Sequence, residues 1–233
     1  MAQDFESRCE NCIIRQLNTL KALKKDELKR ISDSKISRKV KKGERLFEEG
    51  ERLSGVFCVR DGVSKLSKMS DNGKDQIVKL ATKGEVMGQR SVITDEQTNL
   101  SAIALDDMEV CFIPKSEITD NLHNNTEFTN AVLKHMANEL KLSDDQIVDM
   151  AQKTVNQRVA EAILYLHEKF GTDDEGYLKL ILTRSDIADI VGTATELCIR
   201  ILAKFKKQNL ISTQGKRIKI EDRSGLKNVA NGL

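Results

Sequence analysis

Hydrophobic residues in the first half of the chain occur in short runs separated by glycine-containing turns. Seven glycines fall at intervals of four to eleven residues between Gly43 and Gly88, and none follows until Gly171. Short apolar runs bounded by turn residues are typical of β-strands, and several at this spacing favour a sandwich or barrel. Strands are predicted at 55–60, 63–69, 76–80, 100–105 and 109–113, with a turn at 70–75 and a stop at the only proline, Pro114.

A helical period replaces the strand period after this proline. From residue 126 to about residue 150, apolar residues recur mostly at helical spacing, which predicts one helix of about 25 residues. Its apolar positions are Phe128, Val132, Met136, Leu140, Ile147 and Met150. So long a helix extends beyond a small barrel, and its apolar face needs cover. A second copy of the chain would cover it, which predicts a homodimer; packing on the chain's own barrel is the alternative. The predicted dimer contacts are Val132, Met136, Leu140 and Ile147.

Residues 152–233 predict a small, mainly helical domain. An amphipathic helix is expected at 155–170, because Gly171 ends its pattern. A polar loop then leads into the apolar run 177–182. We expect the tail after Asp222 to be frayed.

Two helix-start signals flank a glycine in this domain. Thr183 with Asp186 and Thr193 with Glu196 each form a Thr-x-x-acid pattern, and Gly192 lies between them. Such patterns cap the first turn of a helix, and glycine accommodates the turn between two helices. The segment therefore predicts a helix-turn-helix motif.

The second helix of this motif has an apolar face and a charged face. The predicted buried face comprises Leu197, Ile201, Leu202 and Phe205, and the predicted DNA-reading face Glu196, Arg200, Lys204 and Lys207. Arg200 can form two hydrogen bonds to a guanine edge in the major groove, and Glu196 can accept one from a cytosine amino group. An ordinary solvated helix, with Glu196 used as a cap, is the alternative.

A hairpin is predicted after the helix, at 210–220, turning at Gln214 and Gly215. Its Lys216 and Arg217 are candidates for phosphate contacts. The complete set of predicted DNA contacts is Thr195, Glu196, Ile199, Arg200, Lys204, Lys207, Lys216 and Arg217.

Charge supports this reading only weakly. The chain carries 38 Lys and Arg against 36 Asp and Glu, but residues 152–233 carry 14 against 10 and residues 1–151 carry 24 against 26. A small positive excess is common on solvated surfaces, so it becomes informative only with the helix-turn-helix pattern. The predicted organisation is an N-terminal sensor domain at 1–125, a dimerisation helix at 126–151 and a DNA-binding domain at 152–233.

This order of parts, with three local motifs, resembles the CRP/FNR superfamily of bacterial transcription regulators. The motifs are KGERLFEEG at 42–50, VFCVRDG at 56–62 and Gly192-x3-Glu196-x3-Arg200. The resemblance implies an α+β chain: a double-stranded β-helix (jelly-roll) barrel like that of cyclic-nucleotide-binding domains, a long dimerisation helix and a winged helix-turn-helix. It also implies a homodimer on palindromic double-stranded DNA, with base contacts from Glu196 and Arg200, and allows a contact with RNA polymerase. Ile199 stands where relatives often have Ser or Gly, which leaves the operator sequence open.

One branch of this superfamily binds cyclic AMP, and this chain matches that branch incompletely. The Gly84-Glu85 pair is present, but Thr98-Asn99 stands where cAMP-binding relatives have an arginine followed by Ser or Thr. Loss of a charge-assisted phosphate contact costs about 1.5–3 kcal/mol. Arg90 is the available substitute, so cAMP sensing is the disfavoured alternative, with Gly84, Glu85, Arg90, Thr98 and Asn99 as the candidate effector pocket.

The other branch senses oxygen through an iron–sulfur cluster, and the cysteines match it in part. Cys9-x2-Cys12 has a spacing that lets two thiolates bind one metal or cluster. Cys111 stands where the resemblance places the distant ligand, but Asn18 occupies the position of a further cysteine. A [4Fe-4S] cluster or other metal through Cys9, Cys12 and Cys111 is therefore one ligand short. Asp4, Glu6, Glu10, a histidine or an exogenous group are candidates for the fourth ligand, and Cys58 and Cys198 are interpreted as packing.

Three alternatives to a metal-sensing regulator stay open at this stage. The protein binds no cofactor, it binds a small effector in the barrel, or Cys9 and Cys12 exchange disulfides as an enzyme. The last is disfavoured because no thioredoxin-like βαβ pattern surrounds the pair, and no other catalytic motif occurs. No apolar run is long enough to span a membrane and no signal peptide is recognisable, which predicts a cytoplasmic protein with no membrane partner and reduced thiols.

Overall fold

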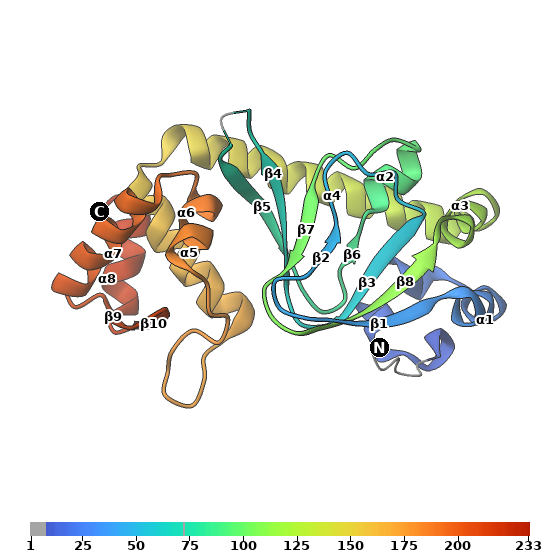
Figure 1. Cartoon of the computed structure of the whole chain (residues 1–233), viewed down its shortest axis with the longest axis horizontal. Helices are drawn as coiled ribbons and strands as arrows, with labels where there is room; N and C mark the ends of the chain where they lie inside the picture. Colours follow the sequence, from blue (N-terminus) through green and yellow to red (C-terminus); the bar gives the residue numbers. More distant parts are fainter. Residues whose placement is uncertain (1–7, 72) are drawn as a thin grey trace. The chain divides into compact units, whose positions relative to one another are not determined.

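Two four-stranded antiparallel sheets form the N-terminal part of the chain, in the strand orders β1-β8-β3-β6 and β2-β7-β4-β5. The computed structural model describes residues 8–71 and 73–233. The strands are β1 (Ile36–Val40), β2 (Arg45–Phe47), β3 (Gly55–Asp61), β4 (Ser64–Met69), β5 (Asp75–Ala81), β6 (Val86–Met87), β7 (Ser101–Ala104) and β8 (Met108–Pro114). Phe47, Phe57, Met87 and Val110 belong to the apolar core of these strands. The predicted barrel is therefore confirmed, and Figure 1 shows the two sheets facing each other.

The central strand pair of the first sheet is β3 with β8. They pair antiparallel in a register that sets Phe57 opposite Phe112 and Cys58 opposite Cys111. The strands approach so closely that a Cβ atom at Gly55 would lie 2.2 Å from the carbonyl oxygen of Ile113. Glycine at this position therefore permits the pairing that brings the two cysteines together.

An N-terminal segment of short helices, absent from the sequence prediction, packs on the sheets. It comprises the 3-10 helices η1 (Cys9–Asn11), η2 (Ile13–Leu17) and η3 (Thr19–Ala22), followed by α1 (Lys25–Ser34). Ile14, Leu20 and Ile31 from these elements are buried against Val56 and Ile113 of the sheet. This second apolar cluster fixes the segment that carries Cys9 and Cys12.

Three more helices follow along the chain: α2 (Gln89–Thr94), α3 (Lys115–Asn124) and α4 (Thr126–Gln152). The long helix α4 confirms the predicted one. The described residues up to Lys141 form one compact unit and those from Leu142 a second, apart from Lys74–Gln76, which group with the second. Within the described residues, no helix combines the length and the apolar composition that crossing a membrane requires.

The C-terminal unit is mainly helical. Its elements are α5 (Val155–Phe170), α6 (Arg184–Val191), α7 (Thr195–Lys207), β9 (Ile211–Gln214), β10 (Arg217–Ile220) and α8 (Arg223–Ala230). Helix α5 has the predicted bounds: Thr154 caps its first turn by accepting a hydrogen bond from the Gln157 amide, and Gly171 follows its last residue.

The expected frayed tail is wrong, because residues 223–230 form α8. Asp222 caps this helix by accepting a hydrogen bond of 2.9 Å from the Gly225 amide. Leu226 is fully buried and Ala230 nearly so, and α8 packs on α5. The end of the chain is thus part of the domain core.

Candidate DNA-binding and sensor sites

The helix-turn-helix is built by α6, a short turn and α7. Thr183 Oγ1 accepts a hydrogen bond of 3.0 Å from the Asp186 amide, and the Asp186 carboxylate accepts one of 3.0 Å from the Thr183 amide. This reciprocal cap confirms the predicted start of α6. Gly192 ends the helix in the left-handed conformation, with φ of 65°, as the turn requires.

The predicted cap of the second helix is wrong. Helix α7 begins at Thr195, and the residue before it, Ala194, makes no side-chain cap. Residues 192–194 form the turn, and the capping position is Ala194. Thr193 therefore lies one residue before the position from which it could cap the helix. Glu196 is consequently not used as a capping residue, which removes one alternative to its predicted role at a base edge.

Helix α7 buries one face and exposes another. Its buried residues are Cys198, Ile201, Leu202 and Phe205. Cys198 is fully buried, whereas Leu197 is only half-buried. The buried face therefore includes Cys198 in place of the predicted Leu197. Burial raises the pKa of Cys198 to about 11, as expected for a packing residue.

The opposite face of α7 carries most of the predicted DNA contacts. Glu196, Arg200, Lys204 and Lys207 are exposed, Ile199 is 48% exposed and Thr195 is half-buried. Within the part of the chain that the structure describes, no hydrogen bond or ion pair engages the charged groups of Glu196 and Arg200. Both groups are therefore available to a base edge without breaking an internal contact.

The β9–β10 hairpin confirms the predicted wing, but its two basic residues differ. Lys216 is exposed at the turn. Arg217 instead pairs with Asp173 at 2.7 Å and with Glu175 at 3.2 Å, and its guanidinium lies 4.1 Å from the centre of the Tyr177 ring. The Arg217 hydrogen bond holds the pKa of Asp173 below its usual value. Arg217 thus fastens the loop after α5 to the wing.

Two further arginines, which the sequence reasoning missed, position the motif. Arg158 on α5 donates a hydrogen bond of 2.9 Å from Nε to the Val191 carbonyl at the end of α6. Arg184 on α6 donates one of 3.0 Å to the Gly215 carbonyl in the wing turn. Neither arginine lies in a recognisable motif, because each donates to a backbone atom far away in sequence.

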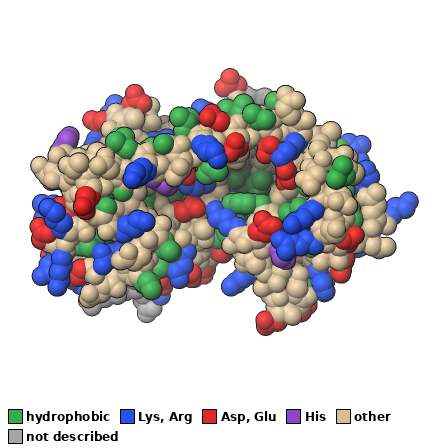
Figure 2. Space-filling view, turned by 180° about the vertical axis from the view of Figure 1, so that it is seen from behind, with side chains coloured by type: hydrophobic (Ala, Val, Ile, Leu, Met, Phe, Trp, Pro, Cys, Tyr) green, Lys and Arg blue, Asp and Glu red, His purple; other side chains and the backbone are tan. Residues whose placement is uncertain are grey.

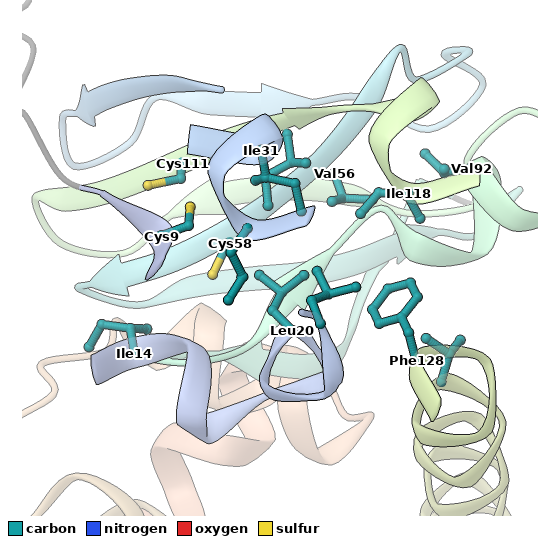
Figure 3. Packing of buried hydrophobic residues seen from close by; sticks show 14 residues of the cluster. Cys9, Ile14, Leu20, Ile31, Val56, Cys58, Val92, Cys111, Ile118 and Phe128 are labelled. Carbon is teal, nitrogen blue, oxygen red and sulfur yellow. The ribbon is translucent and has the colours of Figure 1, made fainter. Parts of the chain in front are cut away.

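In the N-terminal unit, four thiols gather at one end of the barrel. Cys9 belongs to η1 and Cys12 follows it, while Cys58 on β3 lies directly across from Cys111 on β8. Figure 3 shows Cys9, Cys58 and Cys111 on the same side of the apolar cluster. The sequence predicted Cys9, Cys12 and Cys111 as a set, and in the structure Cys58 lies beside Cys111.

Burial and neighbouring charge distinguish these thiols. Burial raises the pKa of Cys58 to about 12, with further increases from Cys111, Cys12 and Cys9, and burial also raises the pKa of Cys9. Lys35 Nζ lies 3.6 Å from Cys111 Sγ, which places a positive charge beside the group. A buried thiol whose pKa is raised, as for Cys9 and Cys58, binds a metal ion only by giving up its proton.

The N-terminal segment is held by its own hydrogen bonds. Cys9 donates one of 2.6 Å from its amide to Ser32 Oγ, and Ser32 Oγ donates one of 2.6 Å to Glu10. This hydrogen bond, with help from Arg8, lowers the pKa of Glu10 to about 2. Cys12 lines a cavity of about 630 Å³ whose wall also includes the basic residue Lys83.

The candidates for a fourth ligand fare differently. Glu10 is engaged by Ser32 and Arg8, and Asp4 and Glu6 lie outside the described residues. Among residues 8–71 and 73–233, no three Cys, His, Asp or Glu side chains lie close enough together to hold a single ion. A [4Fe-4S] cluster differs from a single ion, because each of its four irons takes its own protein ligand.

The five residues of the predicted nucleotide pocket differ in exposure and in the contacts that they make. The Gly84 carbonyl accepts a hydrogen bond of 3.0 Å from Asn18, and Glu85 pairs with Lys79 at 3.4 Å. Thr98 is buried, with its hydroxyl donating to the Leu100 carbonyl, whereas Arg90 and Asn99 are exposed. None of these five candidates lines the cavity beside Cys12.

Each of the two units matches a known protein family. The model of the cyclic nucleotide-binding domain matches residues 37–125, and that of the Crp-like helix-turn-helix domain matches residues 157–229. The chain is 30% identical over 232 residues to the fumarate and nitrate reduction regulatory protein of Yersinia pestis, spanning 97% of this chain and 91% of that protein. It is also 30% identical to the anaerobic regulatory protein of Haemophilus influenzae, spanning 94% and 86% of the two chains.

The fold agrees with these relatives. A transcriptional regulator of the CRP/FNR family from Thermus thermophilus superposes with a TM-score of 0.72 at 20% identity, over 84% of this chain and 98% of that one. This chain therefore belongs to the CRP/FNR family and is a DNA-binding transcription regulator, not an enzyme.

Proposed function

We propose that this regulator is a homodimer that reads a palindromic operator with α7 and responds to oxygen or redox state through an iron–sulfur cluster on its N-terminal thiols. The observation that carries the proposal is the gathering of Cys9, Cys12 and Cys111 at one end of the barrel, in a chain whose relatives are named as anaerobic regulators. The predicted site is thus made by residues far apart in sequence.

The residues present fit such a cluster. Thiolates are the usual ligands of iron–sulfur clusters. Lys35 supplies a positive charge next to Cys111, and the apolar surroundings of Cys9 shield its sulfur from water. When bound, the cluster would supply iron and sulfide that react with oxygen, while the protein supplies the ligands and their shielding.

A series of hydrogen bonds links the η1–η3 segment, which carries Cys9 and Cys12, to the start of α4. The Ala22 carbonyl at the end of η3 accepts a hydrogen bond of 3.3 Å from Asn125, whose side chain also donates one of 2.8 Å to the buried Glu27. Asn125 in turn accepts one of 3.0 Å from the Phe128 amide, in the first turn of α4. A change in the order of η1–η3 would therefore reach the helix that we propose as the dimer interface.

The DNA-reading part rests on the exposed face of α7. Glu196 and Arg200 are separated by four residues, which sets them on the same face of the helix. A twofold dimer would present two copies of this face to two half-sites one helical turn apart, so that the operator is a palindrome. On the face of the molecule seen in Figure 2, basic and acidic side chains are interspersed.

A spectroscopic and binding experiment tests the proposal. The protein is purified without oxygen, and its visible absorption, iron and sulfide are measured before and after exposure to air, together with its affinity for an operator selected from random DNA. We expect iron, an absorption band that bleaches in air, and an affinity that changes as it bleaches. Cys198→Ala is the matched control for iron content and absorption, because this buried thiol lies in the other unit. Protein that stays free of iron after anaerobic reconstitution would contradict the proposal.

A further inference from the structure

A fourth thiol, Cys58 on β3, lies beside the three predicted ligands, although the sequence analysis interpreted it as a packing residue. We propose that Cys58 is the fourth cluster ligand, completing a set with Cys9, Cys12 and Cys111. This inference rests on the iron–sulfur function proposed above. It departs from the spacing of the resembling family, in which a cysteine stands where this chain has Asn18.

The register of the barrel carries the first step of the argument. Cys58 and Cys111 are direct partners on antiparallel strands, so their side chains lie on the same face of the sheet with Cβ atoms about 4.5–5.5 Å apart. If Cys111 binds the cluster, Cys58 stands beside the same site. Both side chains are buried in the apolar cluster that also contains Cys9.

The second step comes from Asn18, which lies against Cys58. The Asn18 side-chain nitrogen is 3.5 Å from Cys58 Sγ, and it also donates to the Gly84 carbonyl. The position at which the family pattern expects a ligand is therefore in contact with the thiol that this chain supplies instead. A ligand moved from residue 18 to residue 58 would stay at the same place in the fold.

The third step is chemical. A thiol matches the other three ligands, and it binds iron by releasing its proton to solvent, with no oxidant or reductant required. The carboxylate candidate Glu10 is already engaged by Ser32 and Arg8. Cys58 is thus a donor of the same kind as the other three ligands, and no ion pair has to break for it to bind.

Cluster stoichiometry tests the assignment. After anaerobic reconstitution we expect about four irons per chain in the unmodified protein, and about three or fewer, with faster bleaching in air, in Cys58→Ala. Asn18→Cys in the Cys58→Ala background is expected to restore the iron, because the new thiol would enter the same place. Iron, sulfide and absorption are measured for each variant, together with the melting temperature of the iron-free protein.

The outcomes separate this inference from the function on which it rests. A fall in iron with an unchanged melting temperature of the iron-free protein supports Cys58 as a ligand. If Cys58→Ala keeps about four irons and the air stability of the unmodified protein, the inference fails while the cluster remains. The iron content can also fall because the protein is destabilised. If the fall comes with a lowered melting temperature, repeats in Cys58→Ser and is not restored by Asn18→Cys, Cys58 is a packing residue and the inference is overturned. An iron-free unmodified protein overturns both proposals.

Discussion

The basic side chains of the C-terminal unit show how contacts within the protein decide which residues remain for a ligand. Arg200 and Lys216 are exposed, whereas Arg217, next to Lys216 in the chain, is held by Asp173 and Tyr177. An arginine stacked on a ring and paired with a carboxylate gives up both contacts if it turns to phosphate. We therefore assign Arg217 to the stability of the wing, and Arg200 and Lys216 stay the proposed DNA contacts.

Replacement of Arg200 tests this division. Arg200→Ala should weaken binding to the selected operator by about 1–3 kcal/mol and change binding to random DNA much less, because a bidentate base contact is lost. Lys216→Ala should weaken binding to both DNAs similarly and reduce the salt dependence, as expected for a phosphate contact. Fluorescence anisotropy over a range of salt concentrations measures both effects. Equal losses on both DNAs for Arg200→Ala would reduce Arg200 to a phosphate contact.

The role of a residue could be predicted from the sequence where it depends on local spacing. It was missed where it depends on the pairing of distant segments. The cap formed by Thr183 and Asp186 lies within one helical turn, so the four-residue pattern Thr-x-x-Asp was enough to predict it. Cys58 was assigned to packing, because only the β3–β8 register shows that it faces Cys111. A register is set by the whole sheet, so spacing along the chain carries no such information.

At the scale of elements, the long periodic segments were the predictable ones. Helices α4 and α5 and the strands β3, β4, β5, β7 and β8 follow the expected ranges closely. The η1–η3 segment was missed because turns of three to five residues are too short to show a period. Helix α8 was missed although Asp222, with an apolar residue at Leu226, gave a start signal.

Helix α8 supplies a prediction about stability. Leu226 is fully buried where α8 packs on α5, so Leu226→Ala should lower the free energy of unfolding by about 2–5 kcal/mol through lost burial and a cavity. Thermal or urea unfolding followed by circular dichroism measures the change. Lys227→Ala, at the exposed next position, is the matched control and should change the stability by less than about 0.5 kcal/mol. A Leu226 variant as stable as this control would mean that the tail does not contribute to the core.

At the scale of the whole molecule, α4 carries a row of exposed apolar side chains. Leu133, Leu140 and Ile147 recur at intervals of seven residues and are 61%, 65% and 67% exposed. Met136 lies between them and is half-buried. The predicted contact Val132 instead belongs to the sensor core, and Leu133 takes its place on the exposed face. A seven-residue repeat of large apolar residues is typical of the seam of a two-helix coiled coil, so a second copy of α4 is the partner that it fits.

A charge placed in this seam should separate the two copies. Leu140→Glu would bury a carboxylate against its own twofold mate, so we expect sedimentation to shift from dimer to monomer, and operator affinity to fall because two half-sites are no longer bound together. Leu142→Glu is the matched control: Leu142 is 58% exposed but lies two residues further on, outside the seven-residue repeat, so this variant should remain dimeric. Sedimentation velocity over a range of concentrations distinguishes the two. A dimer in both variants would place the interface on another surface, whereas monomers in both would indicate that the wider face of α4, rather than the seam, is covered in the dimer.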